Sequence, residues 1–301
     1  MRILCAVDGS EWSQWGIGML EALAPREPER VTALHVVDVG PSAAKGRNPV
    51  ADKRALAAME KAGTVLLRDA VRSARAALGQ AATAPRTKFH SVLARGPIAR
   101  IIVQQAKRAK ADLVIMGSRG LSDVQGFLLG SVSREVVAQA RCPVLVVKRP
   151  ITKLRTVTLA VDDSRHSRSA ARFLRLQFLP EDATVTVLAS VENPVTELAA
   201  RYLSASQLTE LKQPAIDRAA ALVTSLREEF IKDGYSVVTD VRTGHVIETV
   251  VRQVEASGAD LLVIGARAKT KSERLHLGGV SESLLKYAPC SVLVVRGRAG
   301  R

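Results

Sequence analysis

Glycine, serine and arginine residues gather in one loop of the N-terminal half, where their types and spacing suit phosphate binding. The loop opens with Gly117-Ser118-Arg119-Gly120 and, nine residues later, closes with Gly130-Ser131-Val132-Ser133. Glycines let the backbone turn tightly and approach a ligand without a Cβ in the way. A helix that begins at Ser131 would direct unpaired N–H groups and the positive end of its dipole to the same place. Two hydroxyls and the charge of Arg119 complete a pattern that favours an anionic ligand.

This spacing differs from the two best-known phosphate motifs. The loop contains neither the Gly-x-x-x-x-Gly-Lys-[Ser/Thr] of P-loops nor the Gly-x-Gly-x-x-Gly of dinucleotide-binding folds. Glycines before a helix also occur in ordinary connections. From the spacing alone, a plain loop therefore remains an alternative to a phosphate site.

Asp8 is an acidic residue that the expected fold brings to the same edge of the sheet as this loop. It follows the apolar run that starts the chain, and ligands of open α/β sheets bind beyond the carboxyl ends of such strands. The segment Asp8-Gly9-Ser10-Glu11 also fits a capping box of the first helix. We favour a ligand contact for Asp8, with capping as the alternative.

An internal repeat organises the whole chain. Three segments return in order, and from Gly96 onward the offset is a constant 148 residues. They are Ile3–Ser10 as Val157–Ser164, Gly96–Gly117 as Gly244–Gly265, and Cys142–Lys148 as Cys290–Arg296. This pattern indicates a duplication with domains at 1–150 and 151–301.

Each copy alternates short apolar runs with amphipathic stretches, which predicts a doubly wound α/β fold with a parallel five-stranded sheet. Several runs are apolar on both faces, as strands covered by helices on both sides must be. The predicted strands are 2–7, 31–38, 88–94, 112–116 and 143–148, then 156–161, 184–191, 235–241, 260–264 and 291–295; the helices of the first copy are 11–24, 53–79, 97–109 and 131–140.

The last strand of each copy should lie at a sheet edge with unpaired backbone groups. Such edges invite pairing, and two equivalent edges pair antiparallel about a two-fold axis. Because the link near Pro150 is short, we expect Val144–Lys148 and Val292–Arg296 to pair within the chain. A further homodimer stays open.

The motifs of the N-terminal copy resemble the ATP-binding branch of the universal stress protein family. The resemblance rests on Gly-x2-Gly-x9-Gly-[Ser/Thr] after a strand that ends in Met116-Gly117, on an early Val-Asp-x-Ser and on a closing Cys-Pro-Val-Leu-Val-Val. It covers nearly the whole chain, twice over. It implies a Rossmann-like fold of the adenine nucleotide alpha hydrolase type and ATP, with or without Mg²⁺, as the ligand.

The resemblance also implies which residues meet the nucleotide. Asp8 would lie near the ribose, the backbone of Val36 at the adenine edge, and the loop that ends at Ser133 around the sugar and phosphates. The implied contacts are Ala6, Val7, Asp8, Val36, Met116, Gly117, Arg119, Gly120, Gly130, Ser131, Val132 and Ser133.

The C-terminal copy departs from this motif. Ala268 replaces the second glycine of the loop and Gly279 replaces the hydroxyl residue after the third. The added Cβ would hinder close approach to a ligand, whereas Gly279 keeps its N–H. The same loop also carries Arg267, Lys269, Lys271 and Arg274, whose charges favour some residual affinity for anions. We expect weak nucleotide binding or none in this copy.

Composition excludes several classes of protein. The chain has a net charge of +15, which attracts phosphates, but only 3% aromatic residues, which disfavours a stacking platform for nucleic acid. No apolar run reaches membrane-spanning length and the N-terminus is a strand rather than a signal peptide, so we expect a cytoplasmic protein without a membrane partner. The three cysteines and five histidines have no metal-site spacing, and the cysteines should be buried thiols.

The leading hypothesis is a regulatory, ATP-binding stress-response module that signals to a protein partner. A slow ATPase or a nucleotide- or phosphoryl-transferring enzyme is the alternative from another class, although no motif assigns a base or nucleophile. A basic nucleic-acid-associated protein is a third reading that rests on charge alone.

Overall fold

The computed structural model describes most of the chain. The described residues are 1–23, 25, 28–38, 49–79, 86–121, 129–177, 179–192, 195, 202–266 and 278–296, with side chains in the second helix from residue 53 onward.

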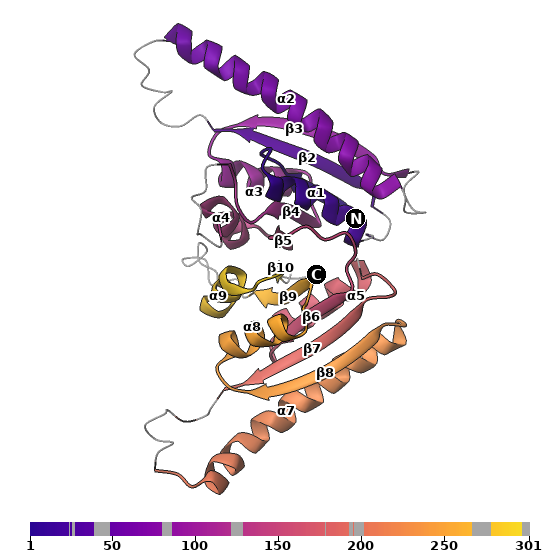
Figure 1. The fold of residues 1–301 in the computed structure, drawn as a ribbon, viewed down its shortest axis with the longest axis vertical. Helices are drawn as coiled ribbons and strands as arrows, with labels where there is room; N and C mark the ends of the chain where they lie inside the picture. The colour runs from indigo at the N-terminus through magenta and orange to yellow at the C-terminus, as the bar shows by residue number, and fades with distance from the viewer. Residues whose placement is uncertain are drawn as a thin grey trace.

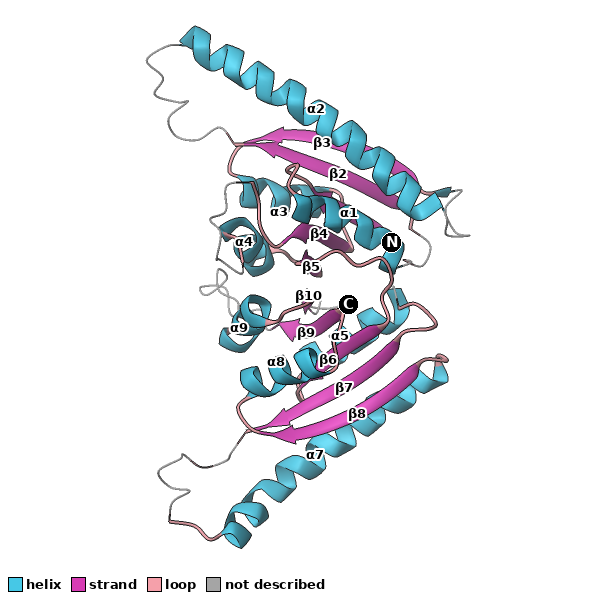
Figure 2. Cartoon of the chain, viewed as in Figure 1, coloured by secondary structure: helices cyan, strands magenta, loops and turns pink. Residues whose placement is uncertain are grey.

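Each copy alternates strands and helices as the sequence predicts (Figure 1, Figure 2). The N-terminal copy contains β1 (Arg2–Ala6), α1 (Glu11–Leu23), β2 (Arg30–Val37), α2 (Pro49–Gly79), β3 (Lys88–Arg95), α3 (Ile98–Arg108), β4 (Leu113–Gly117), α4 (Ser131–Gln139) and β5 (Val144–Val147). The C-terminal copy contains β6 (Thr156–Val161), α5 (Arg165–Gln177), β7 (Thr184–Val191), α7 (Ala205–Lys232), β8 (Ser236–Thr243), α8 (Val246–Ala256), β9 (Leu261–Ala266), α9 (Gly279–Tyr287) and β10 (Ser291–Arg296). The predicted element ends differ by a residue or two, except that α2 begins at Pro49 rather than at residue 53.

The two predicted five-stranded sheets are halves of one ten-stranded sheet, in the order β3-β2-β1-β4-β5-β10-β9-β6-β7-β8. Every pairing within a copy is parallel, and β5 pairs antiparallel with β10. Leu145 lies opposite Leu293, its own equivalent in the C-terminal copy, so the pseudo-two-fold axis passes between these two residues. This confirms the predicted pairing of the last strands. Neither β5 nor β10 is left as an open edge.

Apolar side chains cover both faces of the sheet, because successive strand residues point to opposite sides. Ile3 and Cys5 pack on one face with α1, α2, α5 and α7, whereas Leu4 packs on the other with α3, α4, α8 and α9. Both clusters run through the two copies without a break. The long helices α2 and α7 lie at the two far ends of the molecule (Figure 1).

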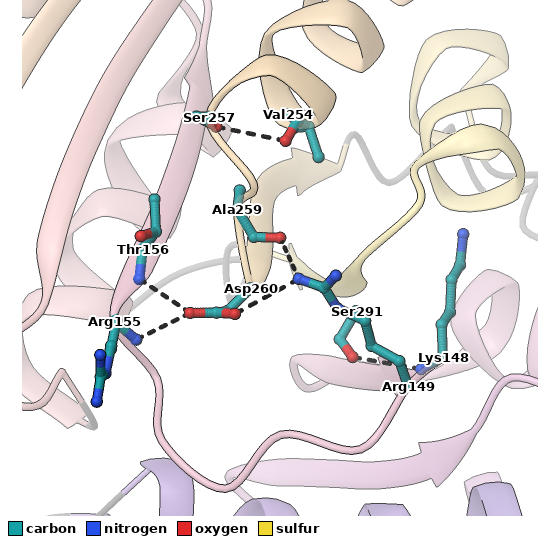
Figure 3. A network of polar contacts seen from close by, with 9 residues as sticks. All are labelled: Lys148, Arg149, Arg155, Thr156, Val254, Ser257, Ala259, Asp260 and Ser291. Atoms are coloured by element: carbon teal, nitrogen blue, oxygen red, sulfur yellow. Dashed lines mark hydrogen bonds and ion pairs between the residues drawn. The ribbon is translucent and has the colours of Figure 1, made fainter.

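The link between the copies is docked on the C-terminal one (Figure 3). Arg149 donates from Nη2 to the carbonyl of Ala259 at 2.8 Å and to Oδ1 of Asp260 at 3.4 Å. Asp260 Oδ2 accepts the N–H groups of Arg155 and Thr156 at 3.0 and 3.1 Å. The link therefore fixes the start of β6 against the start of β9.

In the N-terminal copy, the start of β1 is held against the start of β4 by equivalent contacts, and the guanidinium comes from β1 itself. The equivalent carboxylate, Asp112, accepts the backbone N–H of Arg2 at 2.8 Å and also pairs with the Arg2 guanidinium. Thr156 stands at the position of Arg2 in the C-terminal copy, so the link supplies the missing guanidinium through Arg149.

Other predictions concern single side chains. All three cysteines are buried and free, as predicted. Burial raises the pKa of Cys5 to about 12, so this thiol stays protonated. Within the described part of the chain, no helix is long and apolar enough to cross a membrane, and no group of His, Cys, Asp or Glu is arranged to hold a metal ion.

Candidate functional site

A compact turn follows β1 and holds Asp8 in place. Oδ1 of Asp8 accepts the N–H of Ser10 at 3.0 Å and its hydroxyl at 2.6 Å. Ser10 is the residue that caps α1, because its Oγ accepts the N–H of Ser13 at 3.2 Å. The cap that we predicted for Asp8 is therefore made by Ser10, and Asp8 holds Ser10 in position through Oδ1. Oδ2 of Asp8 makes a different contact.

That second oxygen joins β1 to the loop after β4. Oδ2 of Asp8 accepts the N–H of Leu121 at 3.3 Å. A Cβ on Gly120 would lie 2.8 Å from the same oxygen, so the glycine allows the carboxylate to approach the loop. The φ of Gly120 is not positive, which makes space rather than backbone conformation the reason for glycine here.

Gly117 has a packing role that the motif alone did not reveal. A Cβ on Gly117 would lie 2.7 Å from Cβ of Trp12 and 2.8 Å from its carbonyl carbon, in the first turn of α1. The glycine thus lets the helix that follows Asp8 pack directly on the end of β4. Arg119, two residues further on, places its guanidinium 5.5 Å from the centre of the Trp12 ring, a cation–π contact that holds the charge beside the first turn of α1.

The start of α4 is tied to the same loop. The N–H of Gly130 donates to the carbonyl of Ser118 at 2.8 Å. The Ser133 hydroxyl donates to that carbonyl at 2.9 Å and to the carbonyl of Gly130 at 3.0 Å, and Ser133 is 2% exposed. We expected this hydroxyl to hold phosphate, but the structure commits it to backbone carbonyls. The helix has no side-chain cap and Ser131 is exposed, so the first N–H groups of the helix are the part of the predicted phosphate cradle that no side chain occupies.

The remaining predicted residues line the strand ends. Ala6 and Val7 lead into Asp8, Met116 is buried at the end of β4, and Val36 is buried on β2 next to β1. The structure thus brings the twelve predicted residues to the carboxyl edge of three neighbouring strands and the helix that follows.

His35 supports the site from below, a role that sequence reasoning missed. Its Nδ1 lies 2.8 Å from the carbonyl of Val7, which immediately precedes Asp8. A Cβ on Gly63 would lie 2.6 Å from the His35 ring, so a glycine inside α2 makes room for it. The one sequence feature that could have indicated this role is Gly63, a glycine in the interior of a predicted helix.

The C-terminal copy repeats the turn after its first strand. Asp162 Oδ1 accepts hydrogen bonds from the hydroxyls of Ser164 and Ser167, both at 2.5 Å. A Cβ on Gly265 would lie 2.5 Å from the carbonyl carbon of His166. This is the same kind of close approach as that of Gly117 to Trp12 in the N-terminal copy. The framework of the site is therefore present in both copies.

A cavity of about 370 Å³ lies at this place in the C-terminal copy. It opens between the ends of β6, β7 and β9 and the helices α5, α8 and α9. Its lining residues are Ala160, Val161, Asp162, Ser164, His166, Ser167, Leu188, Ser190, Val246, Val250, Ile264, Gly265, Gly278, Gly279, Val280, Ser281 and Leu284. The altered loop motif has thus not closed the pocket of this copy.

A half-buried lysine connects the site of the N-terminal copy to the interface between copies. Lys148, directly after β5, donates from Nζ to the carbonyls of Ala288 at 2.6 Å and Lys286 at 3.3 Å, at the end of α9. Burial, with the positive charge of Arg119 as a smaller cause, lowers the pKa of Lys148 to about 8.

Comparison with known proteins agrees with this architecture. The model of the universal stress protein family matches residues 1–148 and again residues 153–296. A universal stress protein of Methanocaldococcus jannaschii is 32% identical over 152 residues, which is 50% of this chain and 82% of that protein. One from Thermus aquaticus is 33% identical over 146 residues, 48% of this chain and 97% of that protein.

A solved structure extends the likeness to both copies. The crystal structure of a universal stress protein from Archaeoglobus fulgidus superposes with a TM-score of 0.66 over 98% of this chain and 96% of that one, at 19% identity, which shows a shared fold. The repeat, the doubly wound sheet and the two family matches lead to one conclusion: this chain belongs to the universal stress protein family, with two domains of the family in tandem.

Proposed function

We propose that this protein binds ATP in its N-terminal copy and acts as a regulatory module in a stress response. The observation that carries the proposal is the contact of Asp8 with both the cap of α1 and the loop at Gly120 and Leu121. It fixes the strand ends where ligands of doubly wound sheets bind. Family membership supports the regulatory role.

Different residues would contact the adenosine and the phosphates of the nucleotide. The ends of β1 and β2, with Asp8 and Val36, would hold the adenosine. Arg119 and the N–H groups at the start of α4 would face the phosphates, because a cation and a helix N-terminus both favour negative charge. A Mg²⁺ ion that accompanies the triphosphate would be held chiefly by phosphate oxygens and water, since Mg²⁺ keeps several of its waters.

The same contacts favour binding over catalysis. A general base needs to lie within reach of the proton that it removes, and no motif assigns that role to a residue of this site. The hydrogen bonds from Ser10 and Leu121 hold the Asp8 carboxylate in place and leave it lone pairs for a ligand hydroxyl. ATP turnover should therefore lie far below the median enzyme rate of about 10 per second. Phosphate release near that rate, lost in Asp8→Asn, would favour the enzyme alternative.

Calorimetric titration with ATP tests the proposal. We expect one site per chain, lost in Gly130→Val, which puts a branched side chain at the start of α4. Gly130 has φ −74° and ψ 158°, an extended conformation that valine adopts readily, so the variant should fold. Gly278→Val, at the equivalent extended position in the C-terminal copy, is the matched control and should keep the site. An ATP site that survives Gly130→Val would contradict the proposal.

A further inference from the structure

The ten-stranded sheet ends in two outer strands, β3 and β8, and side chains of α2 cover the first of them (Figure 1). An outer strand carries unpaired backbone N–H and C=O groups and can pair with another strand. In β3, Arg95 forms an ion pair with Glu60 of α2, and Arg75 of α2 lies over the Phe89 ring at 5.2 Å. Lys88 adds a further charge to β3, and charged side chains, lysine above all, discourage the pairing of edges.

β8 has features that favour pairing instead. None of its eight residues is buried, and Val238 is 53% exposed. Most of them are β-branched, which suits an extended strand, and β8 contains neither Lys nor Pro. Its two charged residues, Asp240 and Arg242, form an ion pair at 2.8 Å along one face of the strand, so β8 has no net charge. Within the described part of the chain, β8 pairs with β7 alone.

The side chains of β8 complement each other when the strand pairs antiparallel with itself. A two-fold axis perpendicular to the sheet keeps every side chain on its own face. If this axis passes between two Val241 residues, Asp240 of each molecule lies opposite Arg242 of the other, and Thr239 lies opposite Thr243. An axis at Asp240 or at Arg242 would place like charges opposite each other, which is destabilising. The charges of β8 therefore favour the register centred on Val241.

Helix α7 would add a second contact beside this strand pair. It packs on both β7 and β8, and Glu229 pairs at 3.1 Å with Arg175 of α5, which turns that flank of α7 toward the centre of the sheet. At 3.6 residues per turn, Ala220, Thr224 and Ile231 lie on the opposite flank, toward the β8 edge, and all three are exposed. With strands about 4.8 Å apart, two α7 helices would lie about 10 Å apart across the new pair, a usual packing distance for helices.

We propose that two molecules of this chain associate through antiparallel pairing of their β8 strands, with Val241 at the two-fold axis, and that their α7 helices pack against each other. A second molecule fits this edge because β8 supplies both charges of each ion pair across the axis. The combined sheet would have β3 at both ends, and since α2 covers β3, assembly would stop at a dimer. This inference concerns assembly and does not depend on the proposed ATP site.

Sedimentation velocity of the full chain over a range of concentrations tests the association. We expect a reversible dimer and no larger species. Asp240→Arg places like charges across the axis twice in each dimer and should raise the dissociation constant about tenfold. The double variant Asp240→Arg with Arg242→Asp restores complementary charges and should bring the dissociation constant back near the wild-type value. His90→Arg, an added charge at an exposed position of β3, is the control and should leave it unchanged.

Two neighbouring positions of α7 test the helix contact. Thr224→Arg puts a long charged side chain on the flank that faces the edge and should raise the dissociation constant at least about tenfold. Ser225→Arg, on the flank that faces α5, is the matched control and should have no such effect. Both positions are exposed, so both variants should fold, and thermal unfolding checks this.

Cysteine cross-linking tests the register. Thr239→Cys and Thr243→Cys, mixed under mild oxidation, should form a disulfide-linked dimer, because these positions lie opposite each other with Cβ atoms about 5 Å apart. Each variant alone should cross-link much more slowly, since its own counterpart lies four residues further along, about 14 Å away. The native cysteines are buried and do not compete.

Three results would overturn the inference. The first is a chain that stays monomeric at every concentration, which would leave the β8 edge to a strand of another protein, or one that assembles beyond a dimer. The second is a dimer that both Asp240→Arg and Thr224→Arg leave intact. The third is cross-linking of either cysteine variant alone as fast as in the mixture.

Discussion

Arg134 and Glu282 occupy the same position in the two copies and form an ion pair across the pseudo-two-fold axis, with Nη1 and Oε1 3.8 Å apart. In a homodimer of a single copy, this position would meet itself and place like charges opposite each other. Duplication within one chain removes that constraint, because each copy can carry a different charge. The pair thus marks this interface as specific for one copy of each kind.

Reversal of one charge tests this relationship. Arg134→Glu should lower the free energy of unfolding, and Arg134→Glu with Glu282→Arg should recover most of the loss. Both side chains are partly exposed, at 63% and 39%, so the coupling energy should be roughly 0.2–1 kcal/mol. Urea unfolding of the four members of the double-mutant cycle measures it, at low salt and at 1 M salt. A coupling that does not shrink at high salt would be inconsistent with an ion pair.

Gly117 and Gly18 offer a matched pair of glycine substitutions. Gly117→Ala would place a Cβ 2.8 Å from the backbone of Trp12 and should destabilise the protein by about 1–3 kcal/mol, because neither β4 nor α1 can give way easily. Gly18→Ala, inside α1 with no atom within 4 Å of the new Cβ, should stabilise it by about 0.5–1 kcal/mol. Thermal unfolding of both variants decides. Equal effects would show that the clash at Gly117 is relieved by a small shift of α1.

Much of the fold could be predicted because its signals are local or repeated. Runs such as Val144–Val147 are apolar on both faces. From Gly96 onward, each pattern also occurs a second time, 148 residues later, so that each predicted element has a counterpart that supports it. The pairing of β5 with β10 followed from the short link and from the need of two equivalent edges for partners. Local pattern and long-range geometry agree in these elements.

The candidate site was predicted less completely, because the uses of its side chains depend on distant contacts. The sequence shows that Ser133 can donate a hydrogen bond, but not that the carbonyl of Ser118, fifteen residues earlier, takes it. It shows that Gly117 lacks a Cβ, but not that Trp12 fills the space. The cavity of the C-terminal copy depends on the walls around the loop as well as on the loop itself, and the altered motif did not reveal it.

Removal of the Arg149 guanidinium should loosen the link between the copies. Arg149→Ala loses the bonds to the Ala259 carbonyl and to Asp260, at a cost of about 1 kcal/mol because the side chain is partly exposed. Limited trypsinolysis should then cleave after Lys153 and Arg155 faster than in the wild type. Arg227→Ala, an exposed arginine on α7, is the control and should leave the cleavage rate unchanged. Unchanged cleavage in Arg149→Ala would mean that Asp260 alone holds the link.

Lys148 should make stability depend on pH in a defined direction. Its pKa is about 8 in the folded protein, because burial disfavours its charge, against an ordinary value of 10.5. Above pH 8 the unfolded chain therefore binds more protons at this residue than the folded protein does, and the free energy of unfolding gains a term that rises with pH. Burial raises the pKa of Cys290 to about 11, so this thiol acts in the opposite direction above its ordinary value of 9. The contribution of the lysine is therefore cleanest between pH 8 and 9.

Lys148→Met isolates this contribution. Methionine keeps most of the buried aliphatic stem and removes the charge, although it also gives up the hydrogen bonds to Ala288 and Lys286. The loss of these bonds lowers the free energy of unfolding of the variant by an amount that is constant at low pH. The effect of proton binding then appears as a change with pH in the difference between the unfolding free energies of wild type and variant. Urea unfolding at pH 7, 8 and 9 should show the wild type gaining stability relative to Lys148→Met as the pH rises. Lys232→Met, at an exposed position on α7, should show no such trend. A difference between wild type and Lys148→Met that stays flat from pH 7 to 9 would mean that the carbonyls at the end of α9 fully offset the burial of the charge.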